Sequence, residues 1–260
     1  YRPRQFSISE QVGVGVFSTA VTALRSLRPT CASAATALRS LRPTCALVAA
    51  CALLAGVAVA QSEPGFEKHL LNADSEFSAA VAIDINQDGR LDIVCGAWWY
   101  EAPQWTAHRF REVEQIRGRF DDYSNLAMDV DHDGDTDIIS VNYRSQSLYW
   151  CRNPGPEHLG ELWDSVMIDR PGTSETGRLV DIDGDGELDI LPNGTSFAAW
   201  YQWQADREDS QPFVRRELPS ELIGHGIGAG DLNGDGRIDI VSPNGWAEAP
   251  PDRAQGRWLW

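Results

Sequence analysis

Four stretches of the sequence place acidic or amide side chains at the same positions of a nine-residue pattern. The pattern is D-x-[DN]-x-D-G-x-x-D, and its copies begin at Asp84, Asp129, Asp181 and Asp231. Oxygen side chains at this spacing suit a hard cation, since Ca²⁺ takes roughly six to eight oxygen ligands. The glycine at position 6 permits the sharp turn that brings the position-7 carbonyl inward. The pattern therefore predicts four calcium-binding loops and about four structural Ca²⁺ ions.

The expected ligands are the side chains at positions 1, 3, 5 and 9 and the backbone carbonyl at position 7. They are Asp84, Asn86, Asp88, Arg90 and Asp92; Asp129, Asp131, Asp133, Asp135 and Asp137; Asp181, Asp183, Asp185, Glu187 and Asp189; and Asp231, Asn233, Asp235, Arg237 and Asp239. Loops 129–137 and 181–189 carry more carboxylates than the two Asn-containing loops, so we expect them to bind Ca²⁺ more tightly. The alternative is a set of metal-free Asp/Gly turns, whose carboxylates would repel one another.

The residues that flank each loop exclude a helix–loop–helix site. An EF-hand needs a bidentate Glu at position 12, and that position holds Cys95, Ser140, Pro192 or Ser242. The flanks, such as VAIDI and LDIV, are short apolar runs that are partly β-branched, which favours strands. Each loop is therefore predicted to join two strands of a hairpin.

Two further strands are expected after each hairpin. An aromatic strand follows, at Trp98–Tyr100, Tyr149–Trp150, Trp200–Tyr201 and Trp246, and then a strand that opens on Trp105, Trp163, Phe213 or Trp258. Four strands in a unit of about 40–50 residues are typical of a β-propeller blade. The sequence predicts an all-β β-propeller with four blades, near 78–112, 124–168, 176–218 and 226–260. A strand at Phe66 is expected to pair with the last blade. Because the sequence stops inside the strand that would complete the fourth blade, we expect an incomplete ring and a fragment of a larger propeller.

The loops resemble the FG-GAP, or VCBS, repeat family. The resemblance covers residues 66–260 and includes Gly224–Asp231 and Pro243–Trp246, which are similar to bacterial secreted members. It implies an integrin-α-like propeller with calcium as a structural ion, and a scaffold for binding or adhesion. It does not specify a ligand.

The first 60 residues differ from the rest. Arg25, Arg28, Arg39 and Arg42 precede an apolar run, 45–60, that ends in Ala-Val-Ala. These are the parts of a secretory signal peptide, with cleavage expected after Ala60, and a retained anchor is the alternative. The peptide TALRSLRPTCA occurs twice, at 22–32 and 36–46, which suggests a duplication or a wrongly assigned start. We therefore divide the chain into a signal region, 1–60, unstructured or helical, and a propeller, 61–260.

The net charge of the chain limits the classes of partner that it can bind. The chain has 22 basic and 38 acidic residues, and the acidic excess lies beyond residue 60. Such a surface repels nucleic-acid phosphate, so no nucleic acid is expected as a partner. The expected location is secreted, periplasmic or at the cell surface, with no membrane span in the mature chain. Cys95 and Cys151 could form one disulfide there or remain free thiols.

A ligand site is expected on the propeller rim, where segments entering the inner strands meet. The rim candidates are Glu76, Asp122, Glu175, Arg178 and His225. The sequence favours a non-enzymatic scaffold that binds an extracellular protein or polysaccharide, and no catalytic residue is assigned. The alternative is the propeller portion of a secreted polysaccharide lyase or sugar dehydratase with substrate at this rim, and a third possibility is a structural spacer.

Overall fold

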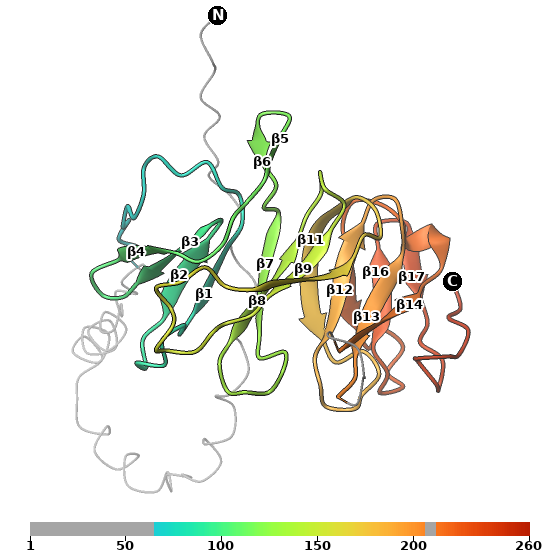
Figure 1. The fold of residues 1–260 in the computed structure, drawn as a ribbon. Coiled ribbons are helices and arrows are strands. Elements are labelled where there is room, and N and C mark those ends of the chain that lie inside the picture. Colours follow the sequence, from blue (N-terminus) through green and yellow to red (C-terminus); the bar gives the residue numbers. More distant parts are fainter. Residues whose placement is uncertain (1–64, 206–211) are drawn as a thin grey trace, which may run out of the picture. The chain divides into compact units, whose positions relative to one another are not determined.

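The computed structural model describes residues 65–205 and 212–260, and this part of the chain is all β apart from one 3-10 turn, η1 (Ser220–Leu222). The strands lie in one compact unit, Lys68–Trp260. They form antiparallel sheets that follow one another along the chain, from blue-green to red in Figure 1. The expected all-β fold built from propeller blades is confirmed.

Three of these sheets have four strands each, joined as simple meanders. The first comprises β1 (Ala80–Ile83), β2 (Asp92–Cys95), β3 (Trp98–Glu101) and β4 (Thr106–Arg109). The second comprises β7 (Ser124–Met128), β8 (Asp137–Val141), β9 (Leu148–Cys151) and β10 (Ser165–Asp169). The third comprises β11 (Ser174–Val180), β12 (Asp189–Gly194), β13 (Ala199–Trp203) and β14 (Phe213–Glu217).

The fourth sheet is shorter than the others. It contains β15 (Gly228–Gly230), β16 (Asp239–Ser242) and β17 (Gly245–Ala247). In place of a fourth strand it has a single antiparallel bridge between Glu248 and Leu259. The backbone N–H of Glu248 donates to Leu259 O at 2.7 Å. The expected strand near Trp258 is therefore present only as this bridge.

Two features differ from the sequence-based expectation. The segment at Phe66 forms no strand, and this side chain is 94% exposed, so the expected strand there is wrong. An aromatic residue alone is insufficient to define a strand where no alternating apolar pattern follows it. A small hairpin, β5 (Gln115–Ile116) with β6 (Arg119–Phe120), was not expected.

The first strands of successive sheets lie side by side. β7 packs against both β1 and β11. Side chains join them: Asn125 Nδ2 donates to Ala79 O at 3.4 Å, and Ser124 Oγ accepts the N–H of Gly177 at 3.3 Å. Strands that radiate from a common axis give this arrangement. Among the described strands no pairing joins the first sheet to the fourth, so the ring is open.

A separate hydrophobic core fills each space between neighbouring sheets. Trp99 and Phe110 pack with Trp163 between the first two sheets, and Trp150 packs with Tyr201 between the second and third. Trp200 lies among residues of the fourth sheet. Trp99, Trp150 and Trp200 are therefore core residues, as their repetition predicted, whereas Trp246 of the fourth sheet is 37% exposed. No helix in the described ranges has the length and hydropathy needed to cross a membrane.

Candidate metal sites and an inter-sheet cleft

Each nine-residue motif joins the first two strands of a sheet. The four loops connect β1 to β2, β7 to β8, β11 to β12 and β15 to β16. Position 6 is a glycine with positive φ in every loop, at 85°, 96°, 100° and 82°. Position 4 is also left-handed, at 58° for Gln87 and His132. The predicted hairpin setting and the predicted turn at position 6 are therefore both present.

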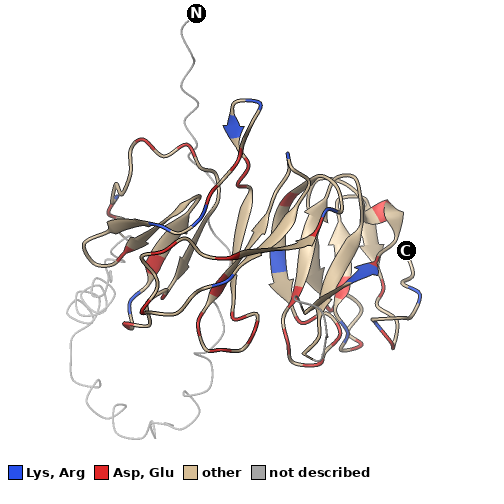
Figure 2. Ribbon diagram, viewed as in Figure 1, with Lys and Arg blue, Asp and Glu red and all other residues tan. Residues whose placement is uncertain are grey.

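The position-1 aspartate holds each loop in shape. Its Oδ2 accepts the N–H of the position-6 glycine at 2.8, 3.1, 3.1 and 3.0 Å in the four loops. The position-5 aspartate accepts the position-7 N–H at 2.8–2.9 Å in the same way. Figure 2 shows the acidic residues of these loops as red stretches of the ribbon.

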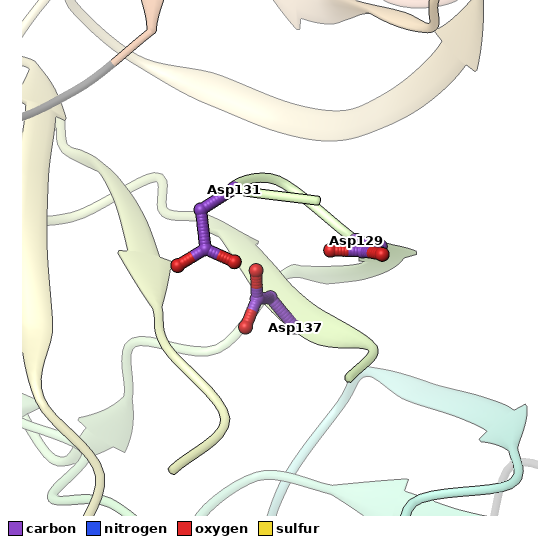
Figure 3. Close-up of side chains that lie close together, drawn as sticks. All are labelled: Asp129, Asp131 and Asp137. Carbon is purple, nitrogen blue, oxygen red and sulfur yellow. The ribbon is translucent and has the colours of Figure 1, made fainter. Parts of the chain in front are cut away.

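The loop 129–137 gathers three carboxylates in one place. Oxygens of Asp129, Asp131 and Asp137 lie within 4.8 Å of one another, and Figure 3 shows the carboxylates of Asp131 and Asp137 facing each other. Oδ1 of Asp129 and Oδ1 of Asp131 are buried and have no hydrogen-bond donor. A buried carboxylate oxygen without a donor is costly, and a cation is the group that would satisfy it.

Burial, with neighbouring negative charge, raises the pKa of carboxyls in this loop. Burial raises the pKa of Asp137 to about 6, with Asp131 adding to it, although the N–H groups of Asn153 and Val130 act in the opposite direction. The pKa of Asp135 is raised by burial and by the charges of Asp133, Asp129 and Asp131. The loop thus concentrates negative charge, which the protein neutralises only in part: Arg152 Nη2 lies 2.5 Å from Asp131 Oδ2 and 3.8 Å from Asp133 Oδ2.

The loop 181–189 has a second cluster. Oxygens of Asp181, Asp183 and Asp185 also lie within 4.8 Å of one another. Burial raises the pKa of Asp183, and the charge of Asp185 raises it further. Gln202 Nε2, on β13, donates to Asp183 Oδ2 at 2.5 Å, so the third strand of the sheet orients a loop ligand.

The two Asn-containing loops are partly neutralised by arginine. Arg90 Nη1 lies 3.5 Å from Asp88 Oδ2, and Arg237 Nη2 lies 2.5 Å from Asp235 Oδ2. In each case the arginine is at position 7 of its own loop and the aspartate is at position 5. Because Arg152 pairs in a similar way with Asp131 of the loop 129–137, these ion pairs leave the difference in charge between the two pairs of loops to their composition.

The position-9 aspartate has a structural role that the sequence did not reveal. In every loop it is at most 1% exposed, and its Oδ2 accepts the N–H of position 2 at 2.9–3.1 Å. Its Oδ1 accepts a second backbone N–H, at 2.7–3.0 Å, from a residue at the end of the third strand or just after it. These donors are Ala102, Asn153, Trp203 and Ala249. One carboxylate therefore ties the loop to the far side of its own sheet.

The donor set suits a hard cation. Every predicted ligand atom is an oxygen, and in the loop 129–137 two of them are buried without donors. Bound Ca²⁺ would supply positive charge to the cluster, and the side chains at positions 1, 3, 5 and 9 with the position-7 carbonyl would hold it.

The five rim candidates do not form one site. Asp122 is fully buried, and its Oδ1 accepts from Arg111 Nη2 at 2.7 Å. His225 Nδ1 lies within hydrogen-bond distance of Glu175 Oε2, at 2.9 Å, on the exposed surface. Arg178 Nε donates to Ile227 O at 3.0 Å, and Glu76 is exposed. Only Glu175 and His225 contact each other, and Asp122 is a buried partner of Arg111 rather than a group on the exposed rim.

An inter-sheet cleft, lined mainly by the second sheet and by the segment 111–121 that joins it to the first sheet, was missed by sequence reasoning. It encloses about 470 Å³ and is lined by Asn142, Tyr149, Trp163 and Ser165 among others. A small side chain opens it: Cys151 occupies the strand position that Tyr100 and Tyr201 fill in the neighbouring sheets. The cysteine at a repeat position that holds tyrosine in the neighbouring sheets was the feature of the sequence that could have revealed the cleft.

Most charged groups at the cleft have partners within the protein, although the exposed carboxylate of Glu114 also lines it. Arg111 Nη2 lies 2.7 Å from Asp122, and Asp121 accepts the N–H groups of Arg144 and Ser145 at 2.8 and 2.6 Å. Glu112 is paired with Arg109. The cleft thus offers mainly hydroxyl, amide and aromatic groups, which suit a neutral polar ligand.

The fold and the loops define a repeat protein of the β-propeller class with acidic hairpin loops. Residues 129–191 match the model of the FG-GAP-like repeat, so the predicted repeat type is confirmed. The chain is 33% identical over 135 residues to cartilage acidic protein 1 of Mus musculus, and 30% identical over 133 residues to that of Homo sapiens. Each match covers 44% of this chain and 20% of the relative, so the chain spans only a fifth of the relatives it matches.

Two solved structures resemble the fold at a low level. An Agrocybe aegerita lectin, described for recognition of non-reducing terminal N-acetylglucosamine, has a TM-score of 0.42 and 18% identity over 70% of this chain and 51% of its own. The V. cholerae biofilm matrix protein Bap1 has a TM-score of 0.39 and 19% identity over 71% of this chain and 30% of its own.

Proposed function

We propose that this chain is an exported scaffold whose FG-GAP-like loops bind Ca²⁺ as a structural ion and whose surface binds a polysaccharide or protein. The observation that carries the calcium part is the pair of buried oxygens without donors, Asp129 Oδ1 and Asp131 Oδ1. They lie beside Asp137 in a cluster of three carboxylates. Ca²⁺ would satisfy these oxygens and remove the repulsion among the carboxylates.

Calcium would act through the position-9 link. Asp137 connects the loop 129–137 to Asn153 and Val130 by backbone N–H groups at 2.7 and 3.0 Å. A cation that fixes the carboxylates in place also fixes these bonds, which hold the strands of one sheet together. Binding only to the folded form stabilises that form by mass action.

The ligand part of the proposal rests on the inter-sheet cleft. Tyr149 and Trp163 supply aromatic surface, and Asn142 and Ser165 supply hydrogen-bonding groups. A sugar ring presents both an apolar face and hydroxyls, so it matches these groups. The cleft would then hold a neutral sugar of an extracellular polysaccharide.

The calcium part is tested by thermal unfolding with millimolar Ca²⁺, with millimolar Mg²⁺ and with chelator. We expect Ca²⁺ to raise the midpoint, and the double variant Asp129→Asn/Asp131→Asn to lose part of that rise. Asn keeps the side-chain shape and one oxygen. Asp164→Asn, which removes an exposed charge outside the loops, is the matched control and should keep the full rise. An equal rise in all three proteins would contradict the assignment.

The ligand part is tested on a microarray of neutral polysaccharides with the calcium-loaded protein. Tyr149→Ala removes aromatic surface from the cleft, and Tyr143→Ala removes a half-buried tyrosine that is not among the cleft residues. Binding that is lost in the first variant and kept in the second supports the cleft. Binding that neither variant changes would place the ligand elsewhere.

A further inference from the structure

Side chains at position 4 of the motif reach from one acidic loop to the next. The acidic loops are, in chain order, loop 1 (84–92), loop 2 (129–137), loop 3 (181–189) and loop 4 (231–239). From loop 1, Gln87 Nε2 donates to Gly134 O at 2.8 Å and to Asp135 Oδ1 at 2.7 Å, both in loop 2. From loop 2, His132 Nε2 lies 3.3 Å from Glu187 Oε2 in loop 3. Gln87 and His132 are therefore linking side chains.

Both ends of these links adjoin predicted Ca²⁺ ligands. Gln87 stands between Asn86 and Asp88, and the N–H of Asp88 donates to Asn86 Oδ1 at 3.1 Å. Each link ends at position 7 of the receiving loop, at Asp135 or Glu187, whose backbone carbonyl is a predicted ligand. An ion in one loop would fix the residues on either side of the linking side chain, and the link would then fix a ligand of the next loop.

The linking side chains stand at a strained backbone position. φ is 58° at both Gln87 and His132, in the left-handed region that non-glycine residues rarely occupy. Loops 3 and 4 have glycine at this position, Gly184 and Gly234, with φ of 79° and 80°. A non-glycine residue persists in this region only where its surroundings hold it there. The contacts with the next loop help to hold the first two turns.

Trp203 supports the link between loops 2 and 3. Its indole stacks on His132, with ring centroids 4.5 Å apart and planes inclined by 17°. The same indole donates to Val130 O in loop 2 at 2.8 Å, and the backbone N–H of Trp203 donates to Asp189 Oδ1 in loop 3 at 3.0 Å. The residue that stacks on His132 therefore also binds the position-9 aspartate of loop 3.

Loop 3 has no such link to loop 4. Gly184 has no side chain, and Arg253 occupies the space that a Cβ there would take. Arg253 Nε instead donates to Ile182 O at 3.0 Å. Among the described residues no hydrogen bond or ion pair joins loop 3 to loop 4. The linked series therefore comprises loops 1, 2 and 3.

We propose that Gln87 and His132 couple Ca²⁺ binding in loops 1, 2 and 3, so that an ion in one loop strengthens binding in the next, whereas loop 4 binds its ion independently. This inference rests on the proposed binding of Ca²⁺ by the loops and adds a route between the sites. The first ion orders its own loop and, through the link, a ligand of the neighbouring loop, so the second ion has less ordering to do. By linkage the effect is the same in both directions.

Each loop carries its own reporter of bound Ca²⁺. The backbone N–H of the position-6 glycine donates to the position-1 aspartate, a predicted ligand, so its NMR signal should shift when the loop fills. The reporters of loops 1, 2 and 4 are Gly89, Gly134 and Gly236. Titration of the full chain, carrying ¹⁵N-labelled glycine, with Ca²⁺ gives one midpoint for each loop. Each signal is assigned by its absence from the corresponding Gly→Ala variant.

A double-mutant cycle isolates the link between loops 1 and 2. Asp133→Ala empties loop 2, and the Gly89 midpoint then reports loop 1 beside an empty neighbour. We expect Asp133→Ala to raise that midpoint about fivefold or more when Gln87 is present. It should change the midpoint little when Gln87→Gly has removed the link. The charge of the empty loop acts alike in both backgrounds, so it cancels in the comparison.

The variants keep the turns while they remove the links. Gln87→Gly gives loop 1 the residue that loops 3 and 4 carry at position 4, and glycine accepts φ of 58° without strain. Gln87→Met keeps a side chain of similar length without an N–H donor, and should also abolish the coupling. For loops 2 and 3 the cycle uses His132→Gly with Asp185→Ala and the Gly134 midpoint. The Gly236 midpoint, in loop 4, should stay unchanged in every variant.

Two results would overturn the proposal while leaving Ca²⁺ binding intact. In one, Asp133→Ala changes the Gly89 midpoint equally with and without Gln87, as expected of a contact that only stabilises the fold. In the other, Gly236 follows Gly89 in every variant, because the effect then spreads through the whole fold rather than through the links. If no glycine signal shifts up to millimolar Ca²⁺, the proposed calcium binding itself fails, and the coupling fails with it.

Discussion

Asp189 and Trp203 connect an acidic loop to the neighbouring sheet. Asp189 Oδ1 accepts the backbone N–H of Trp203 at 3.0 Å, and the indole of Trp203 donates to Val130 O, in the preceding loop motif, at 2.8 Å. Asp189 Oδ2 meanwhile accepts the N–H of Ile182 at 2.9 Å. Two short links therefore run from the loop 181–189 to the loop 129–137.

The first prediction concerns the contribution of the Asp189 carboxylate to stability in the absence of calcium. Asp189 is 1% exposed and both of its oxygens accept backbone N–H groups, so Asp189→Asn places an NH₂ group against an N–H donor. We expect a loss of about 1–3 kcal/mol in the free energy of unfolding. Urea denaturation in chelator measures it, and Asp164→Asn is the charge-matched control. A loss below that of the control would show that the link does not stabilise the fold.

The second prediction concerns the buried ion pair between Arg111 and Asp122. Both side chains are at most 5% exposed, and Arg111 also binds Gly96 O and Asn125. Arg111→Met leaves Asp122 buried without its cation, which should cost about 3–5 kcal/mol. The double variant Arg111→Met/Asp122→Leu should recover much of that loss. Additive losses in urea denaturation would contradict a direct coupling.

The same variant should also change the pH dependence of stability. Burial raises the pKa of Asp122, and Arg111 opposes that rise. Without Arg111 the folded-state pKa increases further, so the folded form retains a proton that the unfolded form releases near pH 4. Stability then falls as pH rises above that value. We expect the deficit of Arg111→Met to be larger at pH 8 than at pH 4.5, and an equal deficit at both would contradict this explanation.

The third prediction concerns the close approach of β11 to the second sheet. A Cβ at Gly177 would lie 2.9 Å from Val141 Cγ2 and 3.0 Å from Leu126 Cδ1. Gly177→Ala should therefore destabilise the fold by about 1–3 kcal/mol through overpacking. Gly230→Ala is the control, because a Cβ there meets nothing within 4 Å. Thermal unfolding of both variants measures the difference, and equal midpoints would contradict the packing.

The sequence predicted the loops, the hairpins and the aromatic core residues because each recurs in every unit. The glycines at position 6 and the aspartates at position 1 fix the turn locally, so composition and spacing sufficed. The rim site could not be predicted in this way, because the burial of Asp122 depends on Arg111, which approaches from another segment. The cleft at Cys151 depends on the space that this small side chain leaves between segments far apart in the sequence, and the spacing of residues in the sequence does not show that space.

The fourth prediction concerns the two cysteines. Cys95 and Cys151 are free in the structure, and burial raises the pKa of the Cys95 thiol. Cys151 is 2% exposed. We expect both to react slowly with iodoacetamide at pH 8 in the folded protein and fully after denaturation without reductant. Peptide mass spectrometry resolves the two sites, and a pair that stays unlabelled after denaturation would indicate a disulfide.

The central claim is that the acidic loops bind calcium, and its most direct test is the number of ions bound per chain. Equilibrium dialysis followed by elemental analysis should give about four Ca²⁺ per chain. Titration should fill the loops 129–137 and 181–189 first, so that Asp133→Ala removes a tight site and Asp88→Ala a weak one. A folded protein that retains no Ca²⁺ at millimolar concentration would contradict the account.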